Sequence, residues 1–329
     1  MNKGRALMDR YGRRHDYLRV SLTDRCNLRC LYCMPAEGVQ WREKAEILTL
    51  EEIEQLVRVF VEHGVRKVRL TGGEPSVRKG YIGLVQRLAG IPGLEQLGLT
   101  TNGLTLAYDA HALKAAGLDS VNVSLDTLSP DRFFQLARRP GHHRVLAGIR
   151  AAVESGLTTK VNVVVLAGTN DDEVLDFVGL TRDWPVTVRF IEFMPFLGNN
   201  WQPDRVIPSA EIRERVSRAF PTRPVARQAS DVASELDIEG HAGKVGFVSS
   251  VSESFCGDCN RLRLTADGQL KCCLFLSPDG NLRDALRAGA SGDKLAAIAQ
   301  NCLDHKWRAH PDMSDWQQRD VLPMVQIGG

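Results

Sequence analysis

Short runs of β-branched and aliphatic residues alternate with longer stretches of helical periodicity through the first part of the chain. The short runs predict strands at 17–22, 67–71, 96–100, 120–124, 160–164 and 186–190. The longer stretches, in which apolar residues recur every three or four positions, predict helices near 50–63, 79–90, 107–116, 144–155 and 171–183. Strands that each return through a helix form a parallel α/β sheet, either open and doubly wound or curled into a partial barrel.

The alternation of apolar and polar residues along each strand distinguishes between these two kinds of sheet. Alternate strand residues face opposite sides, and here one set is apolar, as in Leu18 and Val20, while the other set is polar. Parallel strands covered by helices on both faces are apolar throughout, so the alternation predicts that one face lines a polar cavity. We therefore expect an incomplete (β/α)6 barrel with a ligand inside. A sheet with one face open to water is the alternative.

Five basic side chains share the polar parity, and they come from four of the predicted strands. They are Arg19, Lys67, Arg69, Lys160 and Arg189. Cations gathered in one cavity repel each other unless an anion lies between them, and arginine binds phosphate oxygens with a forked geometry. The pattern predicts a polyphosphate ligand. A nucleoside triphosphate fits better than nucleic acid because the charges lie inside a cavity and not in a surface stripe.

The rhythm of strands and helices breaks at 195–209, which is rich in turn-forming residues. We place a domain boundary there, between residues 1–195 and 196–329. We predict that the second part is α+β, with helices at 212–220 and 282–306. The second of these helices is expected to break near Gly289 and Gly292. Asp267-Gly268 between two apolar runs predicts a β-hairpin.

The overall composition excludes several classes of protein. The formal charge is +2 over 329 residues, which argues against nucleic-acid or membrane-surface binding driven by bulk charge. The sequence shows neither a signal peptide nor an apolar stretch long enough to span a membrane. Clustered cysteines without a signal sequence indicate metal binding in a reducing cytoplasm.

Three cysteines with C-x3-C-x2-C spacing, Cys26, Cys30 and Cys33, are the strongest chemical signal. Three thiolates on one loop can hold three corners of a cubane iron–sulfur cluster and leave the fourth iron open for chemistry. A zinc site or plain buried thiols are the alternatives. Zinc would need a fourth ligand nearby, and the nearest histidine, His15, is eleven residues upstream.

A second set of cysteines lies in the C-terminal part. Cys256 and Cys259 form a C-x2-C turn, and the predicted hairpin would bring Cys273, which thirteen residues separate from Cys259, back beside them. Cys272 adjoins Cys273, so a four-cysteine zinc knuckle is an alternative. Cys302 reads as an ordinary buried thiol on a helix.

The first motif, with Tyr32 before its last cysteine, resembles the signature of radical S-adenosylmethionine (SAM) enzymes. Gly72-Gly73-Glu74-Pro75 after the second strand is similar to their SAM-binding GGE motif. The resemblance implies that a reduced cluster cleaves SAM and releases a deoxyadenosyl radical. The residues that it places around SAM are Tyr32, Gly73, Ser124 and Met194.

The remaining motifs narrow this resemblance to the GTP 3′,8-cyclase family of molybdenum cofactor biosynthesis, from about residue 15 to the end. These motifs are Phe190-Ile191-Glu192-Phe193-Met194, the C-x2-C-N-R-L-R-L run from Cys256, and the terminal Gly328-Gly329. The family implies a partial barrel with a C-terminal domain, and two [4Fe-4S] clusters held by Cys26, Cys30, Cys33, Cys256, Cys259 and Cys273. The implied GTP-binding residues are Arg19, Lys67, Arg69, Thr100, Lys160, Arg189, Arg261, Leu262 and Arg263. The implied catalytic residues are Arg261, Arg263, Gly328 and Gly329.

The resemblance also implies the reaction and its partners. A lyase of this kind converts GTP to (8S)-3′,8-cyclo-7,8-dihydroguanosine 5′-triphosphate, receives electrons from a one-electron donor, and passes its product to cyclic pyranopterin monophosphate synthase; a homodimer is one expected assembly. Two alternatives stay open: a two-cluster radical SAM peptide maturase, and a zinc or iron–sulfur module that binds nucleic acid. The basic cavity argues against the first, and an aromatic content of 6% argues against the second.

Overall fold

The computed structural model describes residues 6–227, 231–253, 255–310 and 322–328. Within them the strands form one sheet in the order β11-β10-β1-β2-β3-β4-β5-β6-β9-β8-β7. The strands are β1 (Tyr17–Ser21), β2 (Lys67–Thr71), β3 (Gln96–Thr101), β4 (Ser120–Ser124), β5 (Thr158–Val165), β6 (Thr187–Glu192), β7 (Thr222–Pro224), β8 (Ser234–Ile238), β9 (Lys244–Val248), β10 (Arg261–Leu264) and β11 (Leu270–Lys271). Strands β10, β1 to β6 and β9 are parallel to one another, which confirms the predicted parallel core of the sheet.

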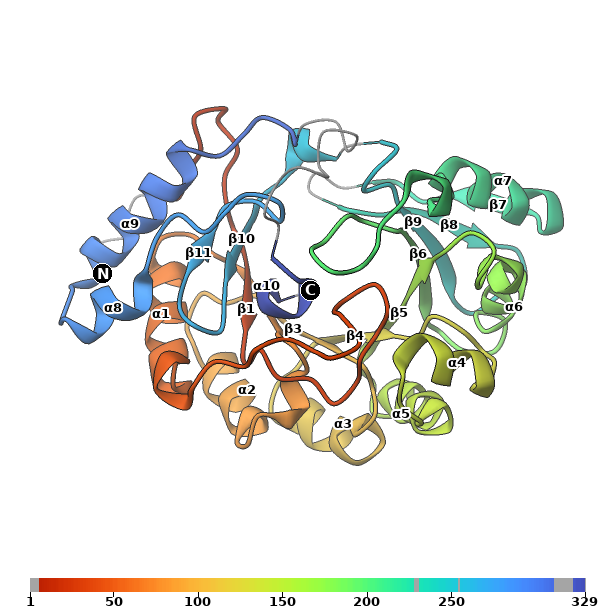
Figure 1. Ribbon diagram of the computed structural model, residues 1–329, viewed down its shortest axis with the longest axis horizontal. Helices are drawn as coiled ribbons and strands as arrows, with labels where there is room; N and C mark the ends of the chain where they lie inside the picture. Colours follow the sequence, from red (N-terminus) through yellow and green to blue (C-terminus); the bar gives the residue numbers. More distant parts are fainter. Residues whose placement is uncertain (1–5, 228–230, 254, 311–321, 329) are drawn as a thin grey trace.

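Helices cover the outside of the curved sheet, and the last helix lies near its centre (Figure 1). They are α1 (Leu50–Glu62), α2 (Tyr81–Ala89), α3 (Leu106–Ala115), α4 (Pro130–Ala137), α5 (His142–Glu154), α6 (Val174–Gly179), α7 (Ser209–Ala219), α8 (Leu282–Arg287), α9 (Gly292–Asp304) and α10 (Met324–Ile327). Among the described helices, none is both long and apolar enough to cross a bilayer.

Local sequence explains where the first helix begins. The Thr49 hydroxyl accepts from the Glu52 backbone N–H at 3.1 Å, and the Glu52 carboxylate accepts from the Thr49 N–H at 2.7 Å. This capping box satisfies two N–H groups that a helix start leaves without partners. The apolar face of α1, including Ile53 and Leu56, is then fully buried.

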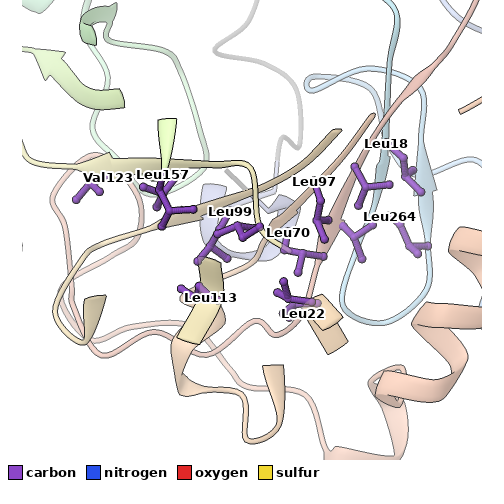
Figure 2. Packing of buried hydrophobic residues seen from close by; sticks show 14 of the residues in the cluster. Leu18, Leu22, Leu70, Leu97, Leu99, Leu113, Val123, Leu157 and Leu264 are labelled. Atoms are coloured by element: carbon purple, nitrogen blue, oxygen red, sulfur yellow. The ribbon is translucent and has the colours of Figure 1, made fainter. Parts of the chain in front are cut away.

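The apolar parity of the strands forms the main hydrophobic core. Leu18, Leu70 and Leu264 are fully buried, and Figure 2 shows them gathered with leucines of β3 on the same side of the sheet. The polar parity faces the other side, as predicted. An incomplete barrel is therefore confirmed, and its outer strands β7 and β11 do not pair with each other in the described sheet.

The part after residue 195 does not build a sheet of its own. Strand β9 extends the sheet beside β6, and β10 extends it beside β1. The predicted hairpin is confirmed as the antiparallel pair β10–β11. Strands β7 to β9 and helix α4 were not predicted, and the helix expected at 171–183 is a 3-10 turn at Asp171–Glu173 followed by the short α6.

Candidate active site

The polar faces of the strands line a cavity of about 350 Å³, within the range of small-molecule sites. Most of the predicted site residues meet there, although they come from distant parts of the chain. Those lining the cavity are Arg19, Cys26, Cys30, Tyr32, Cys33, Lys67, Arg69, Gly73, Thr100, Ser124, Lys160, Arg189, Met194, Arg261 and Arg263.

The first cysteine loop is held against the carboxyl end of the barrel by backbone hydrogen bonds. The N–H groups of Arg29 and Leu31 donate to the last carbonyls of α4, at 2.9 and 3.0 Å. Cys26, Cys30 and Cys33 are half-buried, and none forms a disulfide. Helix α4, absent from our sequence prediction, therefore positions this loop.

The chemistry of these three thiols fits an iron–sulfur cluster. Burial raises the pKa of Cys26 to about 11 and also raises the pKa values of Cys30 and Cys33. Buried thiols of this kind become thiolates only when a bound metal compensates their charge. Within the described residues, no three cysteine, histidine or acidic side chains converge on one metal ion. A cubane cluster joins each cysteine to a different iron, so its ligands stand farther apart than those of one ion.

The Gly-Gly-Glu turn packs directly under this loop. A Cβ on Gly73 would lie 2.2 Å from the carbonyl oxygen of Arg25, so the two backbones approach more closely than any side chain allows. The Glu74 carboxylate is buried and accepts from the Thr101 hydroxyl at 2.7 Å and the Asn102 N–H at 2.6 Å. Glu74 thus joins the ends of β2 and β3 beneath the cysteines.

Asp126 is a cavity residue that our sequence prediction missed. It accepts a hydrogen bond from the Tyr32 hydroxyl and from the Val164 N–H, at 2.9 Å for the latter. Burial raises the pKa of Asp126 to about 6. It shares the parity of Ser124 just beyond β4, so continuing the strand alternation past its end would have found it.

Basic side chains form two rows across neighbouring strands. Arg69, Arg19 and Arg263 stand in register on β2, β1 and β10, and Lys67 and Arg261 flank Tyr17 in the row beside them. Like charges that lie side by side on a sheet destabilise each other. Among the described residues, one of the cavity's basic side chains has an ion pair: the Lys160 ammonium lies 3.6 Å from Glu235.

Several cavity atoms have no hydrogen-bond partner in the described structure. They are the Nε atoms of Arg19 and Arg261, the Thr100 hydroxyl and the Asn122 amide oxygen. Buried polar atoms are normally paired. Cations, donors and acceptors left open in one cavity fit a polar anionic ligand.

Tyr17 partly neutralises this cluster of cations. Its hydroxyl accepts from Arg69 Nε at 3.0 Å, and the Lys67 ammonium lies 4.9 Å from its ring centre. Burial alone would raise its pKa, but the charges of Arg69, Arg19 and Lys67 lower the pKa of Tyr17 to about 6. It has the same parity as Arg19, so the strand alternation could have identified it.

The second cysteine set lines a smaller cavity of about 60 Å³, which shares Arg261, Arg263 and Met194 with the larger one. Cys256, Cys259 and Cys273 are half-buried there. Burial would raise the pKa of Cys259, but Arg261 and Lys306 lower it to about 6, whereas burial raises the pKa of Cys273.

Cys272 and Cys273 have different surroundings. Cys272 is buried in the main core, and its thiol hydrogen-bonds with that of Cys302. Cys273 packs in another cluster with Phe196 and Phe275. Cys302 is buried, as expected. These contacts favour Cys273 as the third ligand of the set.

The C-terminal tail enters the barrel beside the strand ends. The Gly328 carbonyl accepts from Arg263 Nη1 at 3.2 Å, and a Cβ on Gly328 would lie 2.7 Å from the Thr71 hydroxyl oxygen. Gly329 lies outside the described residues. The Leu262 side chain is fully buried in the hydrophobic core on the opposite face of β10 from Arg263 and does not line the cavity, so the substrate-binding role expected of Leu262 stays a prediction.

Comparison with known proteins agrees with this geometry. Residues 20–181 match the radical SAM superfamily, and residues 186–311 match the family described as Molybdenum Cofactor Synthesis C. The chain is 49% identical to the mitochondrial GTP 3′,8-cyclase of Arabidopsis thaliana, over 98% of this chain and 83% of that protein. It is 46% identical to the GTP 3′,8-cyclase of Moorella thermoacetica, over 98% of this chain and all of that one (100%). The chain belongs to the GTP 3′,8-cyclase family.

Some of the chain's relatives are longer. The human molybdenum cofactor biosynthesis protein 1 is 47% identical over 98% of this chain, which spans 51% of that protein. A crystal structure of Streptococcus suis SuiB shares the fold, with a TM-score of 0.59 and 13% identity over 80% of this chain and 62% of SuiB. Membership of the radical SAM superfamily implies one [4Fe-4S] cluster and SAM.

Proposed function

We propose that the protein is a radical SAM lyase that converts GTP to (8S)-3′,8-cyclo-7,8-dihydroguanosine 5′-triphosphate, the first step of molybdenum cofactor biosynthesis. One observation carries the proposal: the cavity lined by basic side chains contains the first cysteine set, and it shares Arg261, Arg263 and Met194 with the smaller cavity that the second cysteine set lines. The names of the relatives support GTP as the substrate.

The first cysteine set would hold the cluster that binds SAM. Cys26, Cys30 and Cys33 are its ligands, and Tyr32, Gly73, Ser124 and Met194 line the SAM site. When bound, the cluster and SAM supply the radical that removes hydrogen from the ribose of GTP.

The chain's own residues would bind and orient GTP. Arg19, Lys67, Lys160 and Arg189 face the triphosphate, since these cations lie inside the barrel and gain an anionic partner. Arg69 already donates to Tyr17, Leu99 and Ser120, so it would offer GTP its remaining N–H groups. Thr100 offers a hydroxyl that has no partner in the described structure.

The base end of GTP would lie toward the second set, where Cys256, Cys259 and Cys273 would hold a second [4Fe-4S] cluster. Arg261 and Arg263 line both cavities and would stabilise negative charge that develops on the substrate. Gly328 brings the tail to Arg263, and a catalytic role for Gly329 stays a prediction from the family resemblance.

The proposed reaction also implies a location in the cell and partner proteins. A cytoplasmic location suits it because both cysteine sets need reduced thiols to bind iron. A one-electron donor would reduce the clusters, and the product would pass to cyclic pyranopterin monophosphate synthase.

We also propose that residues 1–195 and 196–329 form two domains and that the protein assembles as a homodimer.

An anaerobic assay with reconstituted clusters, SAM, dithionite and GTP tests the proposal. We expect 5′-deoxyadenosine and the cyclised nucleotide to appear together by mass spectrometry, and both to vanish in Cys30→Ser. Deoxyadenosine without loss of GTP would reject the substrate. Protein that binds zinc and no iron would reject the radical chemistry.

A further inference from the structure

Lys306 is a buried lysine outside the GTP cavity, just after α9. It is 2% exposed. Its ammonium nitrogen lies 3.4 Å from the Cys259 sulfur and 3.4 and 3.3 Å from the carbonyl oxygens of Cys259 and Arg261. An ammonium group only donates hydrogen bonds. The Cys259 sulfur therefore receives a hydrogen bond from a charged donor that lines neither cavity.

His15 fixes the position of that ammonium. Its Nε2 lies 2.9 Å from Lys306 Nζ, and its Nδ1 lies 2.9 Å from the carbonyl oxygen of Arg13. Because Lys306 cannot accept, Nε2 must carry the lone pair, and Nδ1–H donates to the carbonyl. His15 is thus a neutral acceptor that orients Lys306 without balancing its charge.

Without the Cys259 sulfur, the charged side chains around Lys306 carry a net positive charge. Asp9 pairs with Arg13 at 2.6 Å and also lies 3.7 Å from His15 Nε2, so its single negative charge offsets one of the two positive charges of Arg13 and Lys306. Among the described residues, no carboxylate lies within ion-pair distance of Lys306. A buried cation is costly unless an anion accompanies it. The sulfur of Cys259, as a thiolate or as part of an anionic cluster, is the available partner.

The same N-terminal segment also holds the other end of the C-x2-C turn. Arg13 Nη1 donates to the Cys256 carbonyl at 2.5 Å and to the Arg308 carbonyl at 2.8 Å. Arg13 Nη2 donates to the Trp307 carbonyl at 2.7 Å. Both ends of the turn are therefore fixed by charged donors from two segments that contribute no cluster ligand.

We propose that Lys306 is a positioning residue for the second cluster: its ammonium holds the Cys259 sulfur in place and stabilises the negative charge that the cluster gains on reduction. This inference rests on the second cluster of the proposed function. Hydrogen bonds and positive charge at cluster sulfurs raise the reduction potential. Loss of the charge should therefore make this cluster harder to reduce.

A redox titration followed by electron paramagnetic resonance tests the inference. The full chain carries Cys26→Ser, Cys30→Ser and Cys33→Ser, so that the second set is the source of the signal. At the midpoint potential of this background, Lys306→Met should lower the ratio of reduced to oxidised cluster about tenfold, equivalent to about 59 mV for a one-electron couple. Lys306→Arg should restore much of that ratio. Lys294→Met removes an exposed lysine from α9 and should change nothing.

The possible results distinguish failure of the second cluster from failure of the role of Lys306. A background protein that binds no iron would overturn the second cluster and this inference together. An unchanged ratio of reduced to oxidised cluster in iron-loaded Lys306→Met would overturn this inference alone. The same holds if Lys306→Arg lowers that ratio as much as Lys306→Met does. Lys306→Gln, which keeps a polar side chain without charge, decides the question if Lys306→Met does not fold.

Discussion

Buried guanidinium groups need either protein acceptors or a ligand, and the arginines of this cavity divide between the two. Arg69 donates to three protein oxygens, whereas Arg19 Nε has no partner in the described structure. Burial, and then the charge of Arg69, lowers the pKa of Arg189 to about 10. Burial, and then Arg19, lowers the pKa of Arg263 to about 9. An anion would relieve the cost of charge on each of these side chains.

Arg189→Met tests the anion site. Among the described residues, Arg189 donates hydrogen bonds to Asn162 alone, at 2.6 and 2.9 Å, so its loss should disturb the fold little. We expect KM for GTP to rise roughly 10- to 100-fold, as for loss of one charge-assisted hydrogen bond. Steady-state kinetics under anaerobic conditions measure this. Arg150→Met, which removes an exposed arginine of α5, is the control, and an equal KM in both variants would reject the role.

We predict that the Tyr17 hydroxyl ionises near pH 6. Its pKa is about 6 in the folded protein against 10.0 for a free tyrosine. Folding therefore favours the ionised form, whose contribution to stability is complete above pH 10 and is lost as the pH falls through about 6.

Near-ultraviolet absorbance of metal-free protein measures this ionisation. One tyrosine should ionise near pH 6 in the wild type and not in Tyr17→Phe. GTP should move the transition to higher pH, because its phosphates offset the charges of Arg69, Arg19 and Lys67. Identical titration curves for the two proteins would contradict the prediction.

At the scale of elements, loops at the carboxyl ends of the strands position one another. The Gly73 N–H donates to the Thr23 carbonyl at 2.7 Å, and the Glu74 N–H donates to the Arg25 carbonyl at 2.8 Å. The cysteine loop and the Gly-Gly-Glu turn thus share a short backbone contact. Their relative position depends on the lack of a side chain at Gly73.

Gly73→Ala should separate these two loops, since its Cβ would lie 2.2 Å from the Arg25 carbonyl oxygen. We expect less iron on the first cysteine set and about tenfold weaker binding of SAM, as for a misplaced binding group. Iron analysis and equilibrium binding of SAM measure the two effects. Gly83→Ala on α2, where the nearest atom would be 3.9 Å away, should behave as wild type. Normal SAM affinity in Gly73→Ala would refute the contact's importance.

At the scale of the molecule, the sheet joins both halves of the chain. Strand β1 has β2 on one side and β10 on the other, and β6 lies between β5 and β9. The strands at the ends of the predicted barrel are therefore interior strands of the whole sheet. Each half leaves unpaired strand edges without the other.

Residues 1–195 expressed alone should aggregate, because β1 and β6 would expose long unpaired edges. We expect this fragment to elute as large species in size-exclusion chromatography, whereas the full chain elutes as a defined species. Co-expression of residues 196–329 should recover part of the material. A monodisperse fragment with cooperative thermal unfolding would show that the first part folds independently.

The sequence by itself determined the local features of this protein. Strand alternation at residues such as Arg19 and Lys160 was sufficient to predict a polar cavity, because side-chain direction repeats every two residues. Cysteine spacing likewise predicted two metal-binding sets, and the match to the radical SAM superfamily supports an iron–sulfur cluster in this protein. These signals depend on neighbours within a few residues, so sequence contains them directly.

Only the tertiary structure decided which distant segments meet. The register of Arg263 beside Arg19, and the contact of Lys306 with Cys259, join residues far apart in the chain. Short strands such as β10 carry no local sign of their partner, since parallel pairing is chosen by packing of the whole sheet. Leu262 and Arg263 are adjacent in sequence, yet the sheet sends one to the core and the other to the active site.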